Sequence, residues 1–309
     1  MNRKTRVALI AGHRYGQHLA SSICQNMSHI DFTSAYILDP CRMIDYRGYE
    51  SPLNVLKENN IPVKFFKEIS ELKDDDSLAF DADYTFVCGL RQIIPEKLVL
   101  KITKHSKMSP KPYSREHGLI CFHPSDLPRG RGLSPVQWTI FSGERASAVS
   151  AFYIDFKGID SGPIIKKDHF EILENYDAGD LHEIIGTKIS NIFCSIVQNL
   201  VMRNIAFHNQ EISPANSKTR PQFTLEDSWI DCRIASADNL CIAIRAFAKP
   251  YGGIHSLVDN RPINIFKAIR SDVELGDVEV GCTKNHHDSV FLKCIDGTVK
   301  LLDYIFLDK

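Results

Sequence analysis

The sequence predicts an α/β protein, with an open, mainly parallel sheet in residues 1–210 and a small β-rich domain in residues 211–309. Two observations lead to this fold class. Apolar runs typical of strands alternate with amphipathic helical runs over the first 120 residues, which is the pattern of parallel strands joined by crossover helices. At residues 211–228 two prolines, basic residues and a lower apolar content indicate a wrapping linker, and short runs at strand spacing follow it.

The first domain opens with a pattern typical of a buried strand, RVALIAG, followed by an amphipathic helix, GQHLASSICQNM. The chain then continues with a strand, a helix and two further strands: TSAYILD, SPLNVLKENN, IPVKFF and YTFVCGL. Sheets of this kind bind ligands beyond the carboxyl ends of their strands. Gly12–Tyr15 and Cys88–Ile94 are therefore expected at the ligand-binding edge.

The later elements follow the same reasoning. A helix is expected from Pro135, a strand over residues 147–156 and a long amphipathic helix over residues 178–205. In the C-terminal domain five runs have the spacing of strands: LCIAIRAF, GGIHSLVD, INIFKAI, VFLKCI and VKLLDYIF. Residues 240–247 are thus expected to form the first strand of that domain.

Composition and charge narrow the possible functions. The chain is 43% hydrophobic and 24% charged, as in ordinary globular proteins, and its formal net charge of −1 creates no overall attraction to nucleic acid or anionic membranes. The run VALIA is too short for a signal peptide, and no stretch approaches the roughly 20 apolar residues of a membrane span, so a cytoplasmic protein is expected. Nine scattered cysteines without a CxxC pair indicate reduced thiols, and the adjacent His286 and His287 indicate a surface pair, so no metal is expected.

One run, CFHPSDLPRGRGLSPVQ at residues 121–137, carries most of the functional information. Its prolines exclude a regular helix or central strand, so a turn is expected directly after a strand. His123 could face a cleft there, where an imidazole with a pKa of about 6.5 suits proton transfer or polarisation of a carbonyl. Asp160, flanked by Gly158 and Gly162, could act with it. Taken alone, His123 also fits the role of a hydrogen-bonded structural histidine, and Asp160 also fits an Asx turn that caps a loop.

The same run resembles the signature of folate-dependent formyltransferases. The matching positions are His123, Ser125, Leu127, Pro128, Arg131, Gly132 and Pro135. FYIDFKGIDSGPI resembles a second motif of that family through Asp155, Gly158, Asp160 and Gly162, with one extra residue in its first spacing. CGLRQIIP, residues 88–95, resembles a third, and RPQFTLEDSWID and IRAFAKPYGG are similar to the module that follows the catalytic domain. The resemblance implies a Rossmann-like catalytic domain over residues 1–210 and an OB-like domain over residues 211–309.

The resemblance also implies an activity, the transfer of a formyl group from N10-formyltetrahydrofolate to a substrate amine. His123 would donate a hydrogen bond to the developing oxyanion, and Asp160 would orient the imidazole or relay the amine proton. The pteridine would lie against the following residues: Leu90, Arg91, Gln92, Ile93, Ile94, Asp155, Gly158 and Ile159. Substrate contacts are expected from Gly12, His13, Arg14, Tyr15, Ser125, Asp126 and Arg131.

Cys121 departs from the family pattern, which usually has Asn two residues before the His. A thiol is a weaker donor than an amide, and losing an oxyanion donor can cost about 2.7–4 kcal/mol. Three outcomes are possible: another hydrogen-bond donor replaces the missing amide, the enzyme is slow, or the protein binds its ligands without catalysing a reaction. Cys121 itself has a catalytic role, as a donor or as a covalent nucleophile, or it is a small buried residue at a strand end.

Three functions follow from these alternatives. The favoured substrate is a nucleotide-linked amino-deoxysugar, as used in surface polysaccharide (O-antigen) biosynthesis, because the SDLPRGRG run resembles bacterial sugar-modifying members. A methionyl-tRNA formyltransferase would need a basic linker and C-terminal face, whereas acidic residues outnumber basic ones in residues 211–309, so no nucleic-acid partner is expected. The basic segment 101–117, which is either a solvated loop or an anion-attracting flap beside the site, is the one feature that favours it. The third function is a non-catalytic folate- or nucleotide-binding homologue. The C-terminal domain could serve a homodimer.

Overall fold

The computed structural model describes residues 3–12, 14–42, 51–74, 81–103, 112–213, 215–216 and 218–307. The chain divides into two compact units. The first contains Met1–Pro135, Ala146–Glu171 and Glu183–Arg220, and the second contains Val136–Arg145, Ile172–His182 and Pro221–Lys309. The domain boundary expected after residue 210 stays a prediction, and so does the OB-like character of the C-terminal domain.

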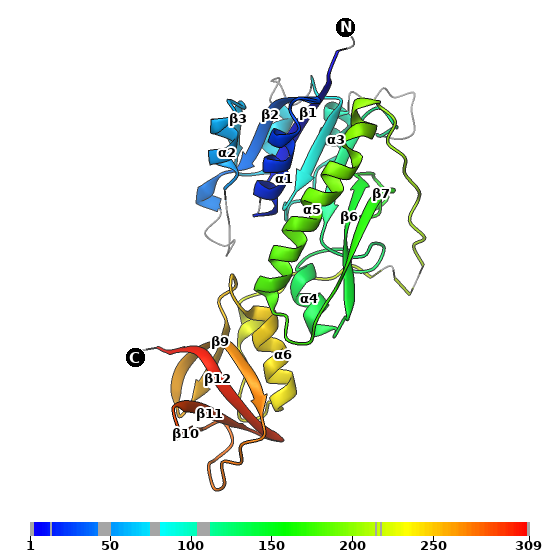
Figure 1. Ribbon diagram of the computed structural model, residues 1–309. Coiled ribbons are helices and arrows are strands. Elements are labelled where there is room, and N and C mark those ends of the chain that lie inside the picture. The colour runs from blue at the N-terminus through cyan, green and yellow to red at the C-terminus, as the bar shows by residue number, and fades with distance from the viewer. Residues whose placement is uncertain are drawn as a thin grey trace. The chain divides into compact units, whose positions relative to one another are not determined.

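The first unit is built on a seven-stranded sheet with the order β3-β2-β1-β4-β5-β6-β7 (Figure 1). The strands are β1 (Thr5–Ala11), β2 (Ile30–Leu38), β3 (Val63–Phe66), β4 (Tyr84–Cys88), β5 (Gly118–His123), β6 (Ala146–Tyr153) and β7 (Ile164–Glu171). Strands β1 to β5 run parallel, whereas β6 and β7 are antiparallel to their neighbours. The open, mainly parallel sheet predicted from the sequence is confirmed.

Helices cover both faces of this sheet. They are α1 (Tyr15–Gln25), α2 (Leu53–Glu58), α3 (Glu96–Ile102) and α5 (Ala178–Val201), with short 3₁₀ turns η1 (Pro40–Arg42) and η2 (Ile69–Asp74). Because side chains alternate along a strand, Val87 of β4 joins the core beneath α3 and η2, while Phe86 packs on Phe193 of α5 with ring centroids 5.3 Å apart. In the described residues α5 alone is long and apolar enough to cross a membrane, but its buried residues make it a core helix, which passes the same test.

The chain reverses its direction of travel across the sheet between β1 and β4. From β1 it runs outward to β2 and β3, and then returns to β4 on the other side of β1. At this point the Gly12 amide donates to the Cys88 carbonyl at 3.1 Å, and a Cβ on Gly12 would lie 2.7 Å from the Gly89 carbonyl oxygen. Glycine is required because the two strand ends approach so closely, which places Gly12 and the 88–94 segment at the carboxyl edge, as predicted.

The second unit contains α4 (Pro135–Phe141) from Val136 onward, η4 (Glu226–Ser228), α6 (Ala237–Phe247) and a five-stranded antiparallel sheet with the order β10-β11-β12-β9-β8. Its strands are β8 (Ile254–Val258), β9 (Arg261–Ser271), β10 (Thr283–His286), β11 (Ser289–Cys294) and β12 (Gly297–Phe306). The short polar strand β10 was not predicted. His286 and His287 close the β10–β11 hairpin and are exposed.

The expectation of a strand over residues 240–247 is wrong, because these residues lie in α6. The Ser236 hydroxyl accepts from the Asn239 amide at 3.2 Å and caps the helix. Leu240, Ala243, Ile244 and Phe247 are buried at the 3–4 residue spacing of one helix face. The Cys-Ile-Ala-Ile run suggested alternation, but the wider spacing and the cap favour the helix.

Candidate active site

His123 is the last residue of β5 and lies in a largely buried position, with 8% of its surface exposed. Its Nε2 lies 2.9 Å from the Gly130 carbonyl oxygen. A carbonyl only accepts hydrogen bonds, so Nε2 carries a proton and donates. The other ring nitrogen, Nδ1, lies 3.6 Å from Oδ2 of Asp160. The backbone thus fixes the tautomer and leaves Nδ1 as the nitrogen that faces the carboxylate.

Asp160 is held on its loop from two sides. Its Oδ2 accepts from the Gly132 amide at 2.9 Å, and its backbone has φ of +50°. The Gln210 amide nitrogen donates to the carbonyls of both Asp160 (2.9 Å) and Gly162 (2.7 Å). At Gly162 a Cβ would lie 1.7 Å from the Tyr153 carbonyl oxygen, so only glycine fits. These contacts hold the carboxylate toward His123.

The rest of the 155–162 loop is organised from within. Asp155 accepts at Oδ1 from the Lys157 amide (3.1 Å), and the Ser161 hydroxyl shares its proton between Asp155 Oδ1 and the Gly158 carbonyl, each at 3.0 Å. Ile159, by contrast, leaves 44% of its surface exposed. Asp155 and Gly158 therefore shape the loop, and Ile159 offers apolar surface beside Asp160.

The turn after His123 uses its polar side chains internally. The Ser125 hydroxyl donates to the Arg129 carbonyl at 3.0 Å, and Arg131, which is buried, donates to the Ile159 carbonyl at 3.3 Å. The backbone of Arg220 forms two hydrogen bonds with the end of the turn. Its amide donates to the Arg131 carbonyl at 2.7 Å, and its carbonyl accepts from the Leu133 amide at 2.9 Å. Ser125 and Arg131 were predicted to bind substrate, and both take part in holding this turn.

Asp126 is an ion-paired residue of the same turn. Its Oδ1 lies 2.8 Å from the Lys167 ammonium and its Oδ2 lies 2.6 Å from the Arg129 guanidinium, while His169 lies 3.5 Å away. Burial raises the pKa of the Asp126 carboxyl, but the hydrogen bonds and charges of Lys167 and Arg129 outweigh burial, and the pKa is lowered. Both carboxylate oxygens are thus occupied within the protein.

Cys121 lies two residues before His123 on β5, on the same side of the sheet, and is half-buried. It packs against a small core cluster of Leu127, Phe152 and Ile164. Burial raises the pKa of the Cys121 thiol well above its usual value, and the negative charge of Asp160 raises the pKa further. The thiol is therefore protonated at neutral pH and is a poor nucleophile.

The residues predicted to hold the pteridine lie at the end of β4. Leu90 and Ile94 are partly buried against the core, whereas Ile93 leaves 72% of its surface exposed. The Gln92 side chain accepts from the Ile69 amide at 2.6 Å and donates to the Lys67 carbonyl at 3.1 Å. Gln92 thus fixes the loop after β3, and Arg91 beside it is partly exposed.

The residues predicted after β1 have different environments. Gly12 lies at the strand crossing described above, and Tyr15 is buried at the start of α1. Arg14 is also largely buried and pairs with Glu183 at 2.8 Å. His13 lies outside the described residues.

Four residues of the site were not predicted: Ser150, Lys167, Gln210 and Arg220. Ser150 is wholly buried in an apolar strand run, a pattern that marks a hydrogen-bonded hydroxyl. No local pattern marks the other three, which reach the site from distant parts of the chain. Over the described ranges, no group of three or more His, Cys, Asp or Glu residues could hold a metal ion.

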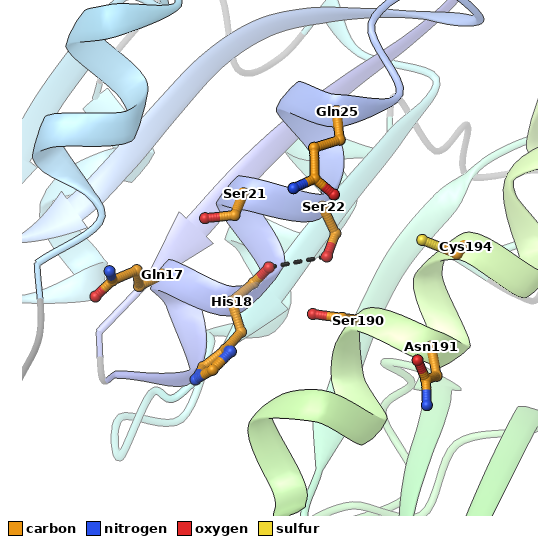
Figure 2. Close-up of a pocket in the computed structure, with 8 residues that line it drawn as sticks. All are labelled: Gln17, His18, Ser21, Ser22, Gln25, Ser190, Asn191 and Cys194. Atoms are coloured by element: carbon orange, nitrogen blue, oxygen red, sulfur yellow. Dashed lines mark hydrogen bonds between the residues drawn. The ribbon is translucent and has the colours of Figure 1, made fainter. Parts of the chain in front are cut away.

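A polar groove of about 340 Å³ lies elsewhere, between α1 and α5 (Figure 2). It is lined by Gln17, His18, Ser21, Ser22, Gln25, Ser190, Asn191 and Cys194. The Ser22 hydroxyl donates to the His18 carbonyl at 2.9 Å within it. None of the predicted site residues lines this groove.

Sequence relatives and solved structures point to one family. Residues 49–197 match the formyl transferase family model. The methionyl-tRNA formyltransferase of Caldanaerobacter subterraneus is 26% identical over 225 residues, which cover 71% of this chain and 69% of that protein. That of Clostridium perfringens is 29% identical over 203 residues, which cover 62% of this chain and 57% of that protein.

Two solved structures share the fold over nearly the whole chain. WlaRD, a sugar 3N-formyl transferase crystallised with dTDP and 5-N-formyl-THF, has a TM-score of 0.66 at 19% identity, with full coverage of both chains. The N-formyltransferase from Helicobacter canadensis, in complex with folinic acid and dTDP-3-aminofucose, has a TM-score of 0.65 at 16% identity and covers 97% of this chain and 100% of that chain. Residues 49–197 therefore match the formyl transferase family, as the motifs at residues 88–95, 121–137 and 155–162 predicted.

Proposed function

We propose that this protein transfers a formyl group from N10-formyltetrahydrofolate to the amino group of a nucleotide-linked amino-deoxysugar. The observation that carries the proposal is the His123–Asp160 pair, whose geometry is fixed by backbone contacts within a formyl transferase domain. With Nε2 committed to the Gly130 carbonyl, Nδ1 is the nitrogen available to reacting groups. An imidazolium at this position would donate from Nδ1 to a developing oxyanion, and Asp160 would stabilise its positive charge.

The folate cosubstrate fits the exposed apolar side chains beside this pair. Ile93 and Ile159 are 72% and 44% exposed although they lie in loops at the carboxyl edge, and such side chains suit contact with a flat pteridine ring. The 90–94 segment and the 155–159 loop would hold the ring, mainly through backbone groups, because Gln92 and Asp155 use their side chains within the protein. The cosubstrate supplies the formyl group, and His123 and Asp160 handle charge and protons around it.

The choice of amine rests on charge and on likeness of fold. Acidic residues outnumber basic ones in residues 211–309, whereas tRNA binding depends on many phosphate contacts. Two solved structures that align along nearly the whole of both chains are sugar N-formyltransferases, and one was crystallised with a dTDP-linked amino sugar. The sequence relatives favour the other candidate, methionyl-tRNA formyltransferase, because eight similar proteins have that activity in their names.

A direct assay separates the two candidates. The protein is incubated with N10-formyltetrahydrofolate and either dTDP-linked 3-amino and 4-amino sugars or methionyl-tRNA of the initiator type, and the product mass is measured. A gain of one formyl group on a nucleotide sugar supports the proposal. Turnover with the charged tRNA alone would establish the other candidate, and no turnover with either would favour a non-catalytic homologue. A cytoplasmic location and a homodimer stay predictions, the latter measurable by light scattering.

A further inference from the structure

Three residues form one row across the last three strands of the large sheet. Ser150 of β6 pairs directly with His123 of β5 on one side and with Lys167 of β7 on the other. Directly opposite residues of antiparallel strands project on the same side of a sheet. His123 therefore shares one face with a buried hydroxyl and an ammonium group.

Both neighbours bind the turn that follows His123. The Ser150 hydroxyl donates to the Ser125 carbonyl at 2.7 Å and accepts from the Leu127 amide at 3.3 Å. The Lys167 ammonium donates to Asp126 at 2.8 Å and also to the Leu127 carbonyl. Residues 125–127 are thus held at four points by two adjacent strands.

Contacts within the turn connect residues 125–127 to the imidazole of His123. The Ser125 hydroxyl fixes the Arg129 carbonyl, and a Cβ on Gly130 would lie 2.8 Å from the Cβ of Ser125, so Ser125 and Gly130 are in close contact. The Gly130 carbonyl in turn accepts from Nε2 of His123. Movement of residues 125–127 would therefore move the acceptor that sets the tautomer and the ring orientation of His123.

We propose that Lys167 and Ser150 are positioning residues, which hold the 125–130 turn so that the Gly130 carbonyl keeps His123 in its Nε2-protonated tautomer. The inference rests on the role proposed for His123 in formyl transfer and does not depend on which amine is the substrate. Lys167 would affect His123 through the 125–130 turn and not by contacting the reacting atoms. A purely stabilising ion pair would leave the histidine unaffected once the protein is folded.

The structure offers a matched control, the ion pair of Lys188 and Asp168. Its Nζ–Oδ1 distance is also 2.8 Å, and its side chains are 24% and 26% exposed, compared with 23% and 19% for Lys167 and Asp126. Asp168 lies next to Lys167 on β7, but no contact joins this pair to the 125–130 turn in the described residues. Lys188→Met therefore removes an equivalent ion pair without touching the turn.

The test measures the His123 side chain by nitrogen-15 NMR of histidine-labelled protein, with the signals assigned from a His123→Asn variant. In the wild type and in Lys188→Met we expect the Nε2-protonated tautomer and a slowly exchanging Nε2 proton. In Lys167→Met and Ser150→Ala we expect exchange of that proton to be at least about tenfold faster, since a charged or buried partner of the turn is lost. Lys167→Arg should restore most of the protection.

Turnover and binding complete the test. Affinity for folinic acid should change less than about threefold in Lys167→Met, while kcat with the accepted amine should fall about tenfold or more. The proposal is overturned when Lys167→Met and Lys188→Met give the same histidine signals. Should Lys167→Met fail to fold, Asp126→Asn removes the charge that pairs with the Lys167 ammonium, with little change of shape, and is judged by the same signals. The NMR arm needs no substrate, so its outcome is independent of the proposed function.

Discussion

Replacing Asp160 by Asn removes the charge that faces His123 while keeping the shape of the side chain. The Asn carbonyl can still accept from the Gly132 amide, so the turn is expected to keep its path. Oδ2 of Asp160 lies 3.6 Å from Nδ1, and the two side chains are 18% and 10% exposed. At an effective dielectric constant of about 20, a carboxylate at this distance stabilises an imidazolium by about 4–5 kcal/mol.

If His123 becomes an imidazolium during formyl transfer, this stabilisation is lost from the transition state in Asp160→Asn. Each 1.36 kcal/mol corresponds to about a tenfold change in rate, so kcat should fall about 10³-fold. Single-turnover measurements with N10-formyltetrahydrofolate and the accepted amine report this step, and folinic acid affinity reports the integrity of the folate site. Asp168→Asn, which alters an ion pair that does not face His123, should stay within about twofold of the wild type. A folded Asp160→Asn protein with more than a tenth of the wild-type kcat would refute the reasoning.

Three further outcomes follow from the same region. Gly132→Ala should lower the free energy of unfolding by about 2–4 kcal/mol, because φ is +101° and the new Cβ would lie 2.4 Å from the Arg220 carbonyl oxygen; urea unfolding measures this. Folding lowers the pKa of the Asp126 carboxyl, so the carboxylate stabilises the fold fully at pH values above its unfolded pKa of about 3.9. That contribution is lost as the pH falls through the folded pKa. The free energy of unfolding of Asp126→Asn should therefore decrease less on acidification than that of the wild type. Because the pKa of the Cys121 thiol is raised, iodoacetamide at pH 8 should modify the exposed Cys194 well before Cys121, which peptide mass spectrometry measures. For the same reason, the kcat of Cys121→Ser should stay within about threefold of the wild-type value.

Each of these outcomes has a control or a contrary result. Gly143 also has a positive φ of +63°, but no atom lies within 4 Å of a Cβ placed there, so Gly143→Ala should cost only about 1 kcal/mol. Equal costs at Gly132 and Gly143 would mean that the contact with Arg220 is not decisive. Parallel acid-unfolding curves for Asp126→Asn and the wild type would contradict the linkage argument. Complete loss of turnover in a folded Cys121→Ser variant would indicate a direct role for the thiol.

The parts of this protein that could be predicted from sequence are those encoded by neighbouring residues. Strand and helix periodicity in the first 120 residues predicted the parallel sheet, and the runs at residues 121–137 and 155–162 predicted where His123 and Asp160 come together. Residues 240–247 were misjudged because a short apolar run fits both a strand and a buried helix face. The Ser236 cap that decides between them lies outside the run.

Contacts that depend on register or on distant segments could not be predicted. Lys167 reaches the His123 turn only because β7 pairs with β6 in one particular register, and a shift by one residue would turn its side chain to the other face. Gln210 reaches Asp160 from a segment with no regular structure, and its sequence context is that of an ordinary polar residue. The motifs thus point to the groups proposed to react, while tertiary pairing decides which residues hold those groups in place.

The backbone contacts of Arg220 have a consequence for how the site is completed during synthesis. Gly132 and its neighbours leave the ribosome long before Arg220, whose backbone donates to the Arg131 carbonyl and accepts from the Leu133 amide. Gln210, which fixes the Asp160 loop, also comes late. A nascent chain that ends before residue 210 contains all seven strands of the sheet, but the 125–133 turn and the 155–162 loop lack their contacts with Gln210 and Arg220. A fragment that ends before Gln210 would therefore keep His123 and Asp160 but lack the contacts that Gln210 and Arg220 make with the loop and the turn.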